Sequence, residues 1–168
     1  AASLAITPDN AYHLIYVIND CELFYSVSID GGTEWSEPQR MHFSELDGRA
    51  IAHTSLLFDD LGNGYATWTE YDVSHSGIPL GVWLSKTYDG GTTWLPAEKI
   101  VDAEGYGQSS LFMTKDRQLI IAWVGNLEVG GRYEQRSLDH GRTWETINEI
   151  VAPDRIRGYA GAVQFMED

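Results

Sequence analysis

Short segments rich in β-branched and aromatic residues recur along the whole chain, and clusters of Asp, Asn, Gly and Pro separate them. This alternation predicts β-strands joined by tight turns. No segment shows a helical period of apolar positions that would compete with this pattern. The predicted strands form three groups of four: 3–7, 13–18, 23–28 and 40–43; 51–58, 65–69, 81–87 and 98–101; and 109–114, 119–124, 132–137 and 149–151.

One turn occurs three times, each time between the third and fourth predicted strands of a group. We call its copies the first, second and third Asp-Gly turns. The Asp residues lie 59 and 50 positions apart, a period that suits one four-stranded sheet per unit. Each copy has a hydroxyl residue, an Asp, a Gly and a Trp at matching positions: Ser28, Asp30, Gly32 and Trp35; Thr87, Asp89, Gly91 and Trp94; and Ser137, Asp139, Gly141 and Trp144, with Thr143 before the last Trp.

Each residue of the turn has a physical role. The Asp carboxylate can accept hydrogen bonds from the backbone N–H groups that follow it, and Gly can take a positive φ without a Cβ clash. The Trp ring can cover the loop and attach the hairpin to its sheet, with about 150 to 250 Å² of surface buried. The repeated turn is therefore expected to be structural.

These turns resemble the Asp-box, or BNR repeat, of the sialidase superfamily of β-propellers, whose pattern is Ser-x-Asp-x-Gly-x-Thr-Trp. The third turn matches every fixed position, the second has Thr87 in place of Ser, and the first has Glu34 where Thr is usual. The resemblance implies an all-β propeller of sialidase type. In that family the boxes lie on the face opposite the active site, so they indicate the fold and not the chemistry.

We expect one propeller region over residues 1–168, with four-stranded blades at about 1–46, 47–103 and 104–152 and the first strand of a fourth blade within 153–168. Propellers typically close with four to eight blades. The chain is therefore expected either to be part of a longer chain or to complete a six-bladed ring as a homodimer. We favour the longer chain, because an extra unpaired strand would leave an exposed edge in a symmetric dimer.

The second unit is longer than the others in one place. Tyr16, Trp68 and Trp123 occupy matching positions in the second strand of each unit, and the spacing from this aromatic to the Asp of the turn is 14, 21 and 16 residues. The excess is assigned to a loop from Glu70 to Pro79. Loops that outgrow their repeat often carry function on a repetitive scaffold.

The resemblance to sialidases also implies a type of site. That family holds the substrate carboxylate with three arginines, uses an Asp as general acid/base, and attacks with a Tyr that a Glu activates. The first arginine belongs to a Phe/Tyr-Arg-Ile-Pro motif, of which this sequence has only partial matches, at Arg49 and at Arg155 to Arg157. The catalytic candidates are Asp72 and Glu70, and the candidate substrate contacts are Arg49, His53, Tyr71, His75, Arg155 and Arg157.

Two functions of different class follow. The chain either contributes to a sialidase-like glycoside hydrolase, although its catalytic set is incomplete, or it is a non-catalytic propeller that binds glycan or protein. Two carboxylates across one pocket would favour hydrolysis, since glycosidases place such a pair about 5 to 9 Å apart. A flat face with exposed aromatics such as Tyr71 and Tyr106 would favour binding.

The composition of the chain excludes some classes of binding partner. The net charge of −14 over 168 residues argues against nucleic acid, and no apolar run is long enough for membrane insertion. The expected partner is a glycan or another small molecule. No cofactor is implied, and no metal site is predicted, because Cys21 is the single cysteine and Asp59-Asp60 lacks the ligand alternation of a calcium loop. The resemblance implies an extracellular or periplasmic location.

Overall fold

The computed structural model describes residues 1–44 and 48–151, which contain twelve β-strands and no helix. Every pairing is antiparallel between strands consecutive in the chain, so each sheet is a simple meander. The three four-stranded sheets are β1 (Ala2–Ile6), β2 (Tyr12–Ile18), β3 (Glu22–Ser28) and β4 (Gln39–Phe43); β5 (Arg49–Phe58), β6 (Gly64–Asp72), β7 (Ile78–Thr87) and β8 (Glu98–Val101); and β9 (Tyr106–Met113), β10 (Leu119–Gly125), β11 (Arg132–Ser137) and β12 (Asn148–Val151).

The three predicted groups of strands are confirmed, with one correction. The expanded loop was expected over 70–79, but β6 runs on to Asp72 and β7 begins at Ile78. Tyr71 pairs with Pro79 and Asp72 with Ile78. The extra residues therefore lengthen the β6–β7 hairpin, and only 73–77 remain as its loop. The predicted strand within 153–168 lies outside the described residues.

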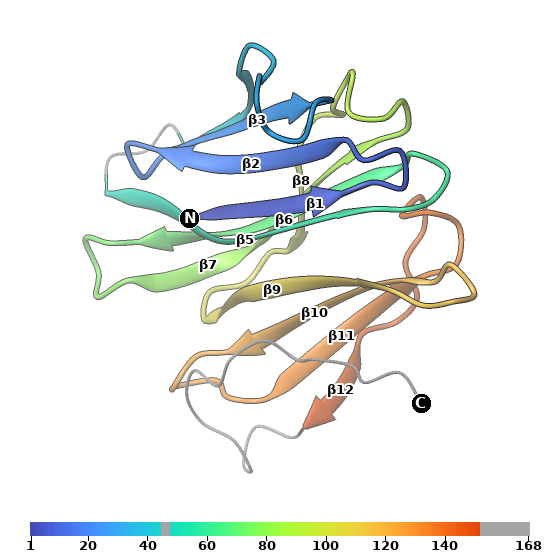
Figure 1. The fold of residues 1–168 in the computed structure, drawn as a ribbon. Coiled ribbons are helices and arrows are strands. Elements are labelled where there is room, and N and C mark those ends of the chain that lie inside the picture. The colour runs from blue at the N-terminus through green and yellow to red at the C-terminus, as the bar shows by residue number, and fades with distance from the viewer. Residues whose placement is uncertain (45–47, 152–168) are drawn as a thin grey trace.

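The sheets are arranged as propeller blades, with the first strand of each blade against the first strand of the next (Figure 1). Ser3 on β1 donates from its hydroxyl to the backbone oxygen of Thr54 on β5 at 2.6 Å. The backbone N–H of Leu111 on β9 donates to the hydroxyl of Ser55 on β5 at 3.1 Å. The strands β1, β5 and β9 are therefore the inner strands around a common axis.

Two apolar clusters lie between the blades. One joins Ile15, Leu23 and Tyr25 of the first blade to Ile51, Ala66 and Trp68 of the second. The other joins Tyr65, Val82 and Leu84 of the second blade to Leu111, Leu119, Ile121 and Trp123 of the third. Because both faces of the second blade are covered, β6 is buried without alternation from Gly64 to Thr69.

The other face of the first blade is largely apolar, and none of residues 1–44 and 48–151 covers it. Leu4 and Ile6 are 51% and 56% exposed, and the strand register places Ile18 and Phe43 on the same face. The alternate side chains of the same sheet, such as Ile15 and Leu23, point instead to the opposite face, into the cluster shared with the second blade. No described residue of the chain packs as a further blade on this face.

Each of the three Asp-Gly turns has the same two hydrogen bonds, in which the hydroxyl residue donates to the Asp carboxylate and accepts from the Gly N–H. In the third turn Ser137 donates to the Asp139 carboxylate at 2.8 Å and accepts from the Gly141 N–H at 2.8 Å. The Thr143 hydroxyl donates to the second carboxylate oxygen of Asp139 at 2.6 Å, and this bond, the largest influence, lowers the pKa of Asp139. The expected local role of the Asp is therefore confirmed.

The second and third turns also dock on the preceding blade. The ring of Trp94 lies edge-on to Tyr25 of the first blade, with centroids 5.3 Å apart. Lys86 on β7 donates to the backbone oxygen of Gly141 at 2.7 Å, and Tyr88 donates to that of His140 at 3.1 Å. Trp35 of the first turn remains 39% exposed. The turns thus fasten neighbouring blades together as well as closing their own hairpins.

Candidate functional site

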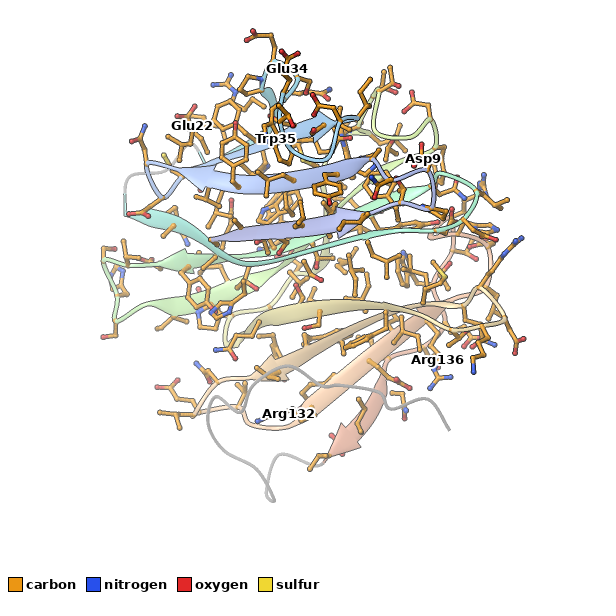
Figure 2. The ribbon with its side chains drawn as sticks, in the orientation of Figure 1. Asp9, Glu22, Glu34, Trp35, Arg132 and Arg136 are labelled. Atoms are coloured by element: carbon orange, nitrogen blue, oxygen red, sulfur yellow. The ribbon has the colours of Figure 1, made fainter. Side chains whose placement is uncertain are left out.

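The two ends of the blades carry different features. The β6–β7 and β10–β11 loops lie at the left in Figure 1, whereas the second and third Asp-Gly turns lie at the right. Figure 2 places Glu22, at the start of β3, near the left end of the first blade, and Asp9 and Arg136 at the right. The β6–β7 loop, which contains His75, and the adjoining strand ends that carry Arg49 and Asp72 therefore lie at the end opposite these turns.

Two adjoining cavities open at the loop end of the second blade, and we call them together the acidic pocket. Their volumes are about 350 and 270 Å³, and both are lined by Leu80 and Glu104. The larger is also lined by Arg49, Glu70, Lys99, Asp102 and Ala103, and the smaller by Asp72, His75 and Ile78. Four of the candidates, Arg49, Glu70, Asp72 and His75, are thus brought together.

Glu70 occupies a bulge in β6, where the pairing with β7 shifts between Thr69 and Tyr71. Bulges of this kind redirect a side chain. His42 on β4 of the first blade donates from Nε2 to the Glu70 carboxylate at 2.8 Å, and the Glu70 side chain is only 12% exposed. Burial, the largest influence, opposes ionisation, but the hydrogen bonds and the nearby His42 outweigh it and lower the pKa of Glu70. Glu70 is therefore a carboxylate at neutral pH.

Asp72 lies opposite Arg49 in the β5–β6 register. Its carboxylate is 3.9 Å from the Arg49 guanidinium and 3.1 Å from Nδ1 of His75, and it accepts the Ser74 hydroxyl hydrogen bond at 2.5 Å. The Ser74 hydrogen bond is the first cause of a lowered pKa for Asp72, and His75 adds to it. The second carboxylate of the pocket is therefore also ionised at neutral pH.

Several residues that line the pocket, and one that orients a lining residue, were missed by the sequence analysis. His42 orients Glu70 from another blade, and Lys99 on β8 pairs with Asp102 at 2.6 Å. Glu104 lies in the connection between β8 and β9, which is fastened by Gly105 donating to the Pro79 oxygen at 2.7 Å. The one available signal was position, because Asp102 and Glu104 fall in a segment that joins one blade to the next.

His53 and Tyr71 are not among the residues that line the acidic pocket, and their rings are 5.7 Å apart. His53 has a φ of +49°, in a break of the β5–β6 pairing between Ala52 and Ser55. The left-handed region is uncommon for residues other than Gly and marks strain. Burial lowers the pKa of His53. Tyr71 and Tyr106 are both half-buried, so neither is a fully exposed aromatic side chain.

The same strain recurs on the inner strand of the third blade. Gln108 has a φ of +52°, in a break of the β9–β10 pairing. Ala52 and Gly107, which precede the two strained residues, pair with the residue that follows Trp68 and Trp123, respectively. His53 and Gln108 therefore occupy equivalent positions. Aligning the units on Trp68 and Trp123 is the signal that could have identified Gln108.

The remaining expectations concern the other candidate arginines, a metal site and a membrane span. Arg155 and Arg157 lie outside the described residues. Over residues 1–44 and 48–151, Arg49 is the one arginine that lines the acidic pocket. In the same part of the chain, no three His, Cys, Asp or Glu side chains converge as a metal-ligand set, and no helix is long and apolar enough to cross a membrane.

Solved structures of similar fold include several propellers. The chain superimposes on a Hadza microbial sialidase, Hz136, with a TM-score of 0.65, 17% identity, and coverage of 85% of this chain and 36% of the sialidase. A family 25 polysaccharide lyase, an ulvan lyase, gives a TM-score of 0.66 and 10% identity over 94% of this chain and 44% of the lyase. Zg3597, a family 117 glycoside hydrolase from Zobellia galactanivorans, gives a TM-score of 0.57 and 14% identity, over 86% of this chain and 53% of the hydrolase.

The search of protein-family models and the search of curated proteins gave no match. The structural similarity, at identities of 10 to 17%, defines the fold alone, and that fold is a sialidase-like propeller. The chain spans about a third to a half of each of these three structures. The three described blades are therefore a partial propeller.

Proposed function

We propose that this chain is the glycan-recognition part of a sialidase-like, Asp-box propeller that processes glycans. The observation that carries the proposal is the acidic pocket, in which Glu70 and Asp72 line adjoining cavities beside Arg49. The pocket lies at the end opposite the Asp-Gly turns, as the resemblance implies for an active site. Carboxylates and guanidinium groups are suitable partners for sugar hydroxyls and for an acidic sugar, respectively.

The two carboxylates have defined tasks in this proposal. Both are ionised in the ligand-free site and accept hydrogen bonds from sugar hydroxyls. Glu70 is held in one orientation by His42, and Arg49 binds an acidic group while remaining close to Asp72. Hydrolysis requires one carboxyl group to be protonated as general acid, and exclusion of water by a bound glycan raises a carboxyl pKa in that direction.

The alternative is a non-catalytic propeller that binds glycan. It is favoured by the arginine content of the acidic pocket, because Arg49 is the only arginine among its described lining residues and already faces Asp72. Under both functions the glycan contacts are the same. Turnover separates the two, since only the hydrolase releases a free sugar.

Calorimetry and a hydrolysis assay on the same glycans test the proposal. We would titrate the chain with N-acetylneuraminic acid, 3′-sialyllactose and neutral and uronic-acid oligosaccharides. Glu70→Gln and Asp72→Asn are each expected to weaken binding by at least about tenfold, since a hydrogen bond to a charged group contributes about 1.5 to 3 kcal/mol. Asp9→Asn, at the opposite end of the first blade (Figure 2), is the matched control. Binding that both pocket variants leave unchanged would exclude this site.

The whole protein's assembly and location belong to the same proposal. Ring closure requires further blades, supplied by the rest of a longer chain or by a second copy of this one. An extracellular or periplasmic location would place the pocket where polymeric glycans are accessible.

A further inference from the structure

A third cavity, of about 340 Å³, lies between the second and third blades, and we call it the aromatic pocket. It shares Asp102 and Ala103 with the acidic pocket, so the two adjoin at the connection between β8 and β9. Beyond these residues its wall includes Tyr106, Trp123, Tyr133 and Ile147. Its walls are thus largely aromatic and aliphatic, in contrast to those of its neighbour.

The aromatic rings form a layered wall. Tyr106 meets Tyr133 edge-on, with centroids 5.4 Å apart and planes at 75°. Trp123 stacks on Tyr133 at 6.1 Å and is 2% exposed, so it supports the tyrosine rather than offering a surface of its own. Burial, and then the neighbouring Tyr106, raises the pKa of Tyr133 to about 12. Tyr133 is therefore neutral, and the two tyrosine rings present amphipathic surfaces to the cavity.

The rim that separates the two pockets is polar and fixed in place. The Asp102 side chain is 79% exposed and pairs with Lys99 at 2.6 Å. Gly105 donates to the Pro79 oxygen on the second blade, and the N–H of Asn126 on the third blade donates to the Gly105 oxygen, both at 2.7 Å. The rim is therefore held from both blades, and the spacing of the two pockets is preset.

We propose that the aromatic pocket is a second sugar subsite, which holds the pyranose ring next to the one in the acidic pocket. This inference rests on the proposed function. A pyranose presents a face of C–H groups and an edge of hydroxyls, which match the tyrosine rings and the Asp102 carboxylate, respectively. Since the two pockets share Asp102 and Ala103, adjacent rings of one glycan can occupy both at once. The preferred ligand is therefore an oligosaccharide rather than a single sugar.

Aromatic ¹H–¹³C NMR, with backbone amides recorded in parallel, tests the subsite directly. The chain is titrated with N-acetylneuraminic acid and with 3′-sialyllactose. We expect both sugars to shift the amides of Arg49 and Ile78, and only the trisaccharide to shift the ring signals of Tyr106 and Tyr133. Shifts of the tyrosine rings with neither sugar, while the acidic pocket responds, would overturn the subsite and leave the proposed function intact. No response in either pocket would overturn both.

Substitutions provide the second test. Tyr106→Leu is expected to lower the affinity for the trisaccharide at least fivefold, while the affinity for the monosaccharide stays the same. Tyr133→Phe keeps the ring and is expected to lower the affinity for the trisaccharide less. Tyr16→Leu, on the first blade and outside both pockets, is the matched control. Circular dichroism establishes that each variant folds. Equal losses for the two sugars, or no loss in either variant, would overturn the subsite.

Discussion

His42 on the outermost strand of the first blade donates a hydrogen bond to Glu70 on the second strand of the next, at 2.8 Å. The imidazole lies close to Trp68 and Trp83, with ring centroids 5.1 and 4.9 Å apart, so its position is set by packing. A side chain of one blade thus orients a carboxylate in another and helps to lower its pKa. The acidic pocket depends on the contact between blades.

The charge state of Glu70 is the first test of that contact. Replacing His42 with Phe removes the donor while burial remains, so the pKa of Glu70 is expected to rise. The pKa of Asp72, which depends first on Ser74, is expected to stay the same and serves as the internal control. Carboxyl ¹³C chemical shifts followed against pH measure both. An unchanged Glu70 would mean that His42 does not set its ionisation.

The first Asp-Gly turn lacks one hydrogen bond that the other two have. The hydroxyls of Thr93 and Thr143 each donate to a carboxylate oxygen at 2.6 Å, whereas Glu34 occupies this position in the first turn. We expect Glu34→Thr to lower the pKa of Asp30 further and to raise the urea midpoint of unfolding. Glu37→Thr, just beyond the turn, is the control and is expected to change neither. A lower midpoint for Glu34→Thr would contradict the prediction.

Substitutions at two neighbouring glycines of the second turn distinguish the cost of backbone strain from the cost of a lost contact between blades. Gly90 and Gly91 have φ values of +70° and +88°, so Ala at either position costs about 1 to 2 kcal/mol of strain. A Cβ at Gly90 meets nothing within 4 Å, whereas at Gly91 it would collide with the Tyr25 hydroxyl of the first blade. Gly91→Ala is therefore expected to be less stable than Gly90→Ala by about a further 1 to 3 kcal/mol. Urea unfolding of the pair measures the difference, and equal losses would argue against this docking contact.

Stability is expected to fall in mildly acidic solution because of His13. This side chain is 4% exposed, its Nδ1 is 2.8 Å from the Tyr25 hydroxyl, and its ring lies 3.9 Å from that of Phe58. Burial lowers the pKa of His13 below its usual 6.5, so the folded state favours the neutral ring. The neutral His13 therefore contributes fully to the free energy of unfolding above its pKa in the unfolded chain. This contribution is lost as the pH falls through its lower pKa in the folded protein.

Urea midpoints measured from pH 8 to pH 4.5 test this expectation. His13→Phe is expected to flatten the decline in this range. A smaller slope should remain, because burial lowers the pKa of His53 in the same direction. His53→Phe, measured over the same range, accounts for that remaining part. A slope that neither substitution changes would assign the acid sensitivity to the carboxylates.

The uncovered face of the first blade is expected to cause self-association. Leu4 and Ile6 expose apolar surface beside Ile18 and Phe43, which in solution favours contact with a second copy. Light scattering coupled to size exclusion would give the mass of the particle. Ile6→Lys is expected to shift it towards the monomer, and the exposed Lys115→Glu, on the third blade, is the control. A monomer at about 100 μM for the unsubstituted chain would contradict the prediction and favour blades from a longer chain.

The sequence by itself determined the strands, the turns and the fold class. The reason is that the chemistry involved is local: Asp30 accepts hydrogen bonds from the N–H groups of Thr33 and Glu34, three and four residues ahead. Alternation and turn residues are equally local, so they are readable without the fold. The placement of Glu70 and Asp72 after the second predicted strand of the longer unit followed from the same pattern.

Only the tertiary structure decided which of these residues meet. The continuation of β6 to Asp72 depends on its pairing with Ile78. The orientation of Glu70 depends on His42 from another blade. The aromatic pocket depends on the contact between Tyr106 and Tyr133, which lie on different strands of the third sheet. Such contacts join residues far apart in the chain, and no local pattern encodes their distances. Burial, which determines the ionisation of His13 and opposes that of Glu70, is likewise a property of the packed blades.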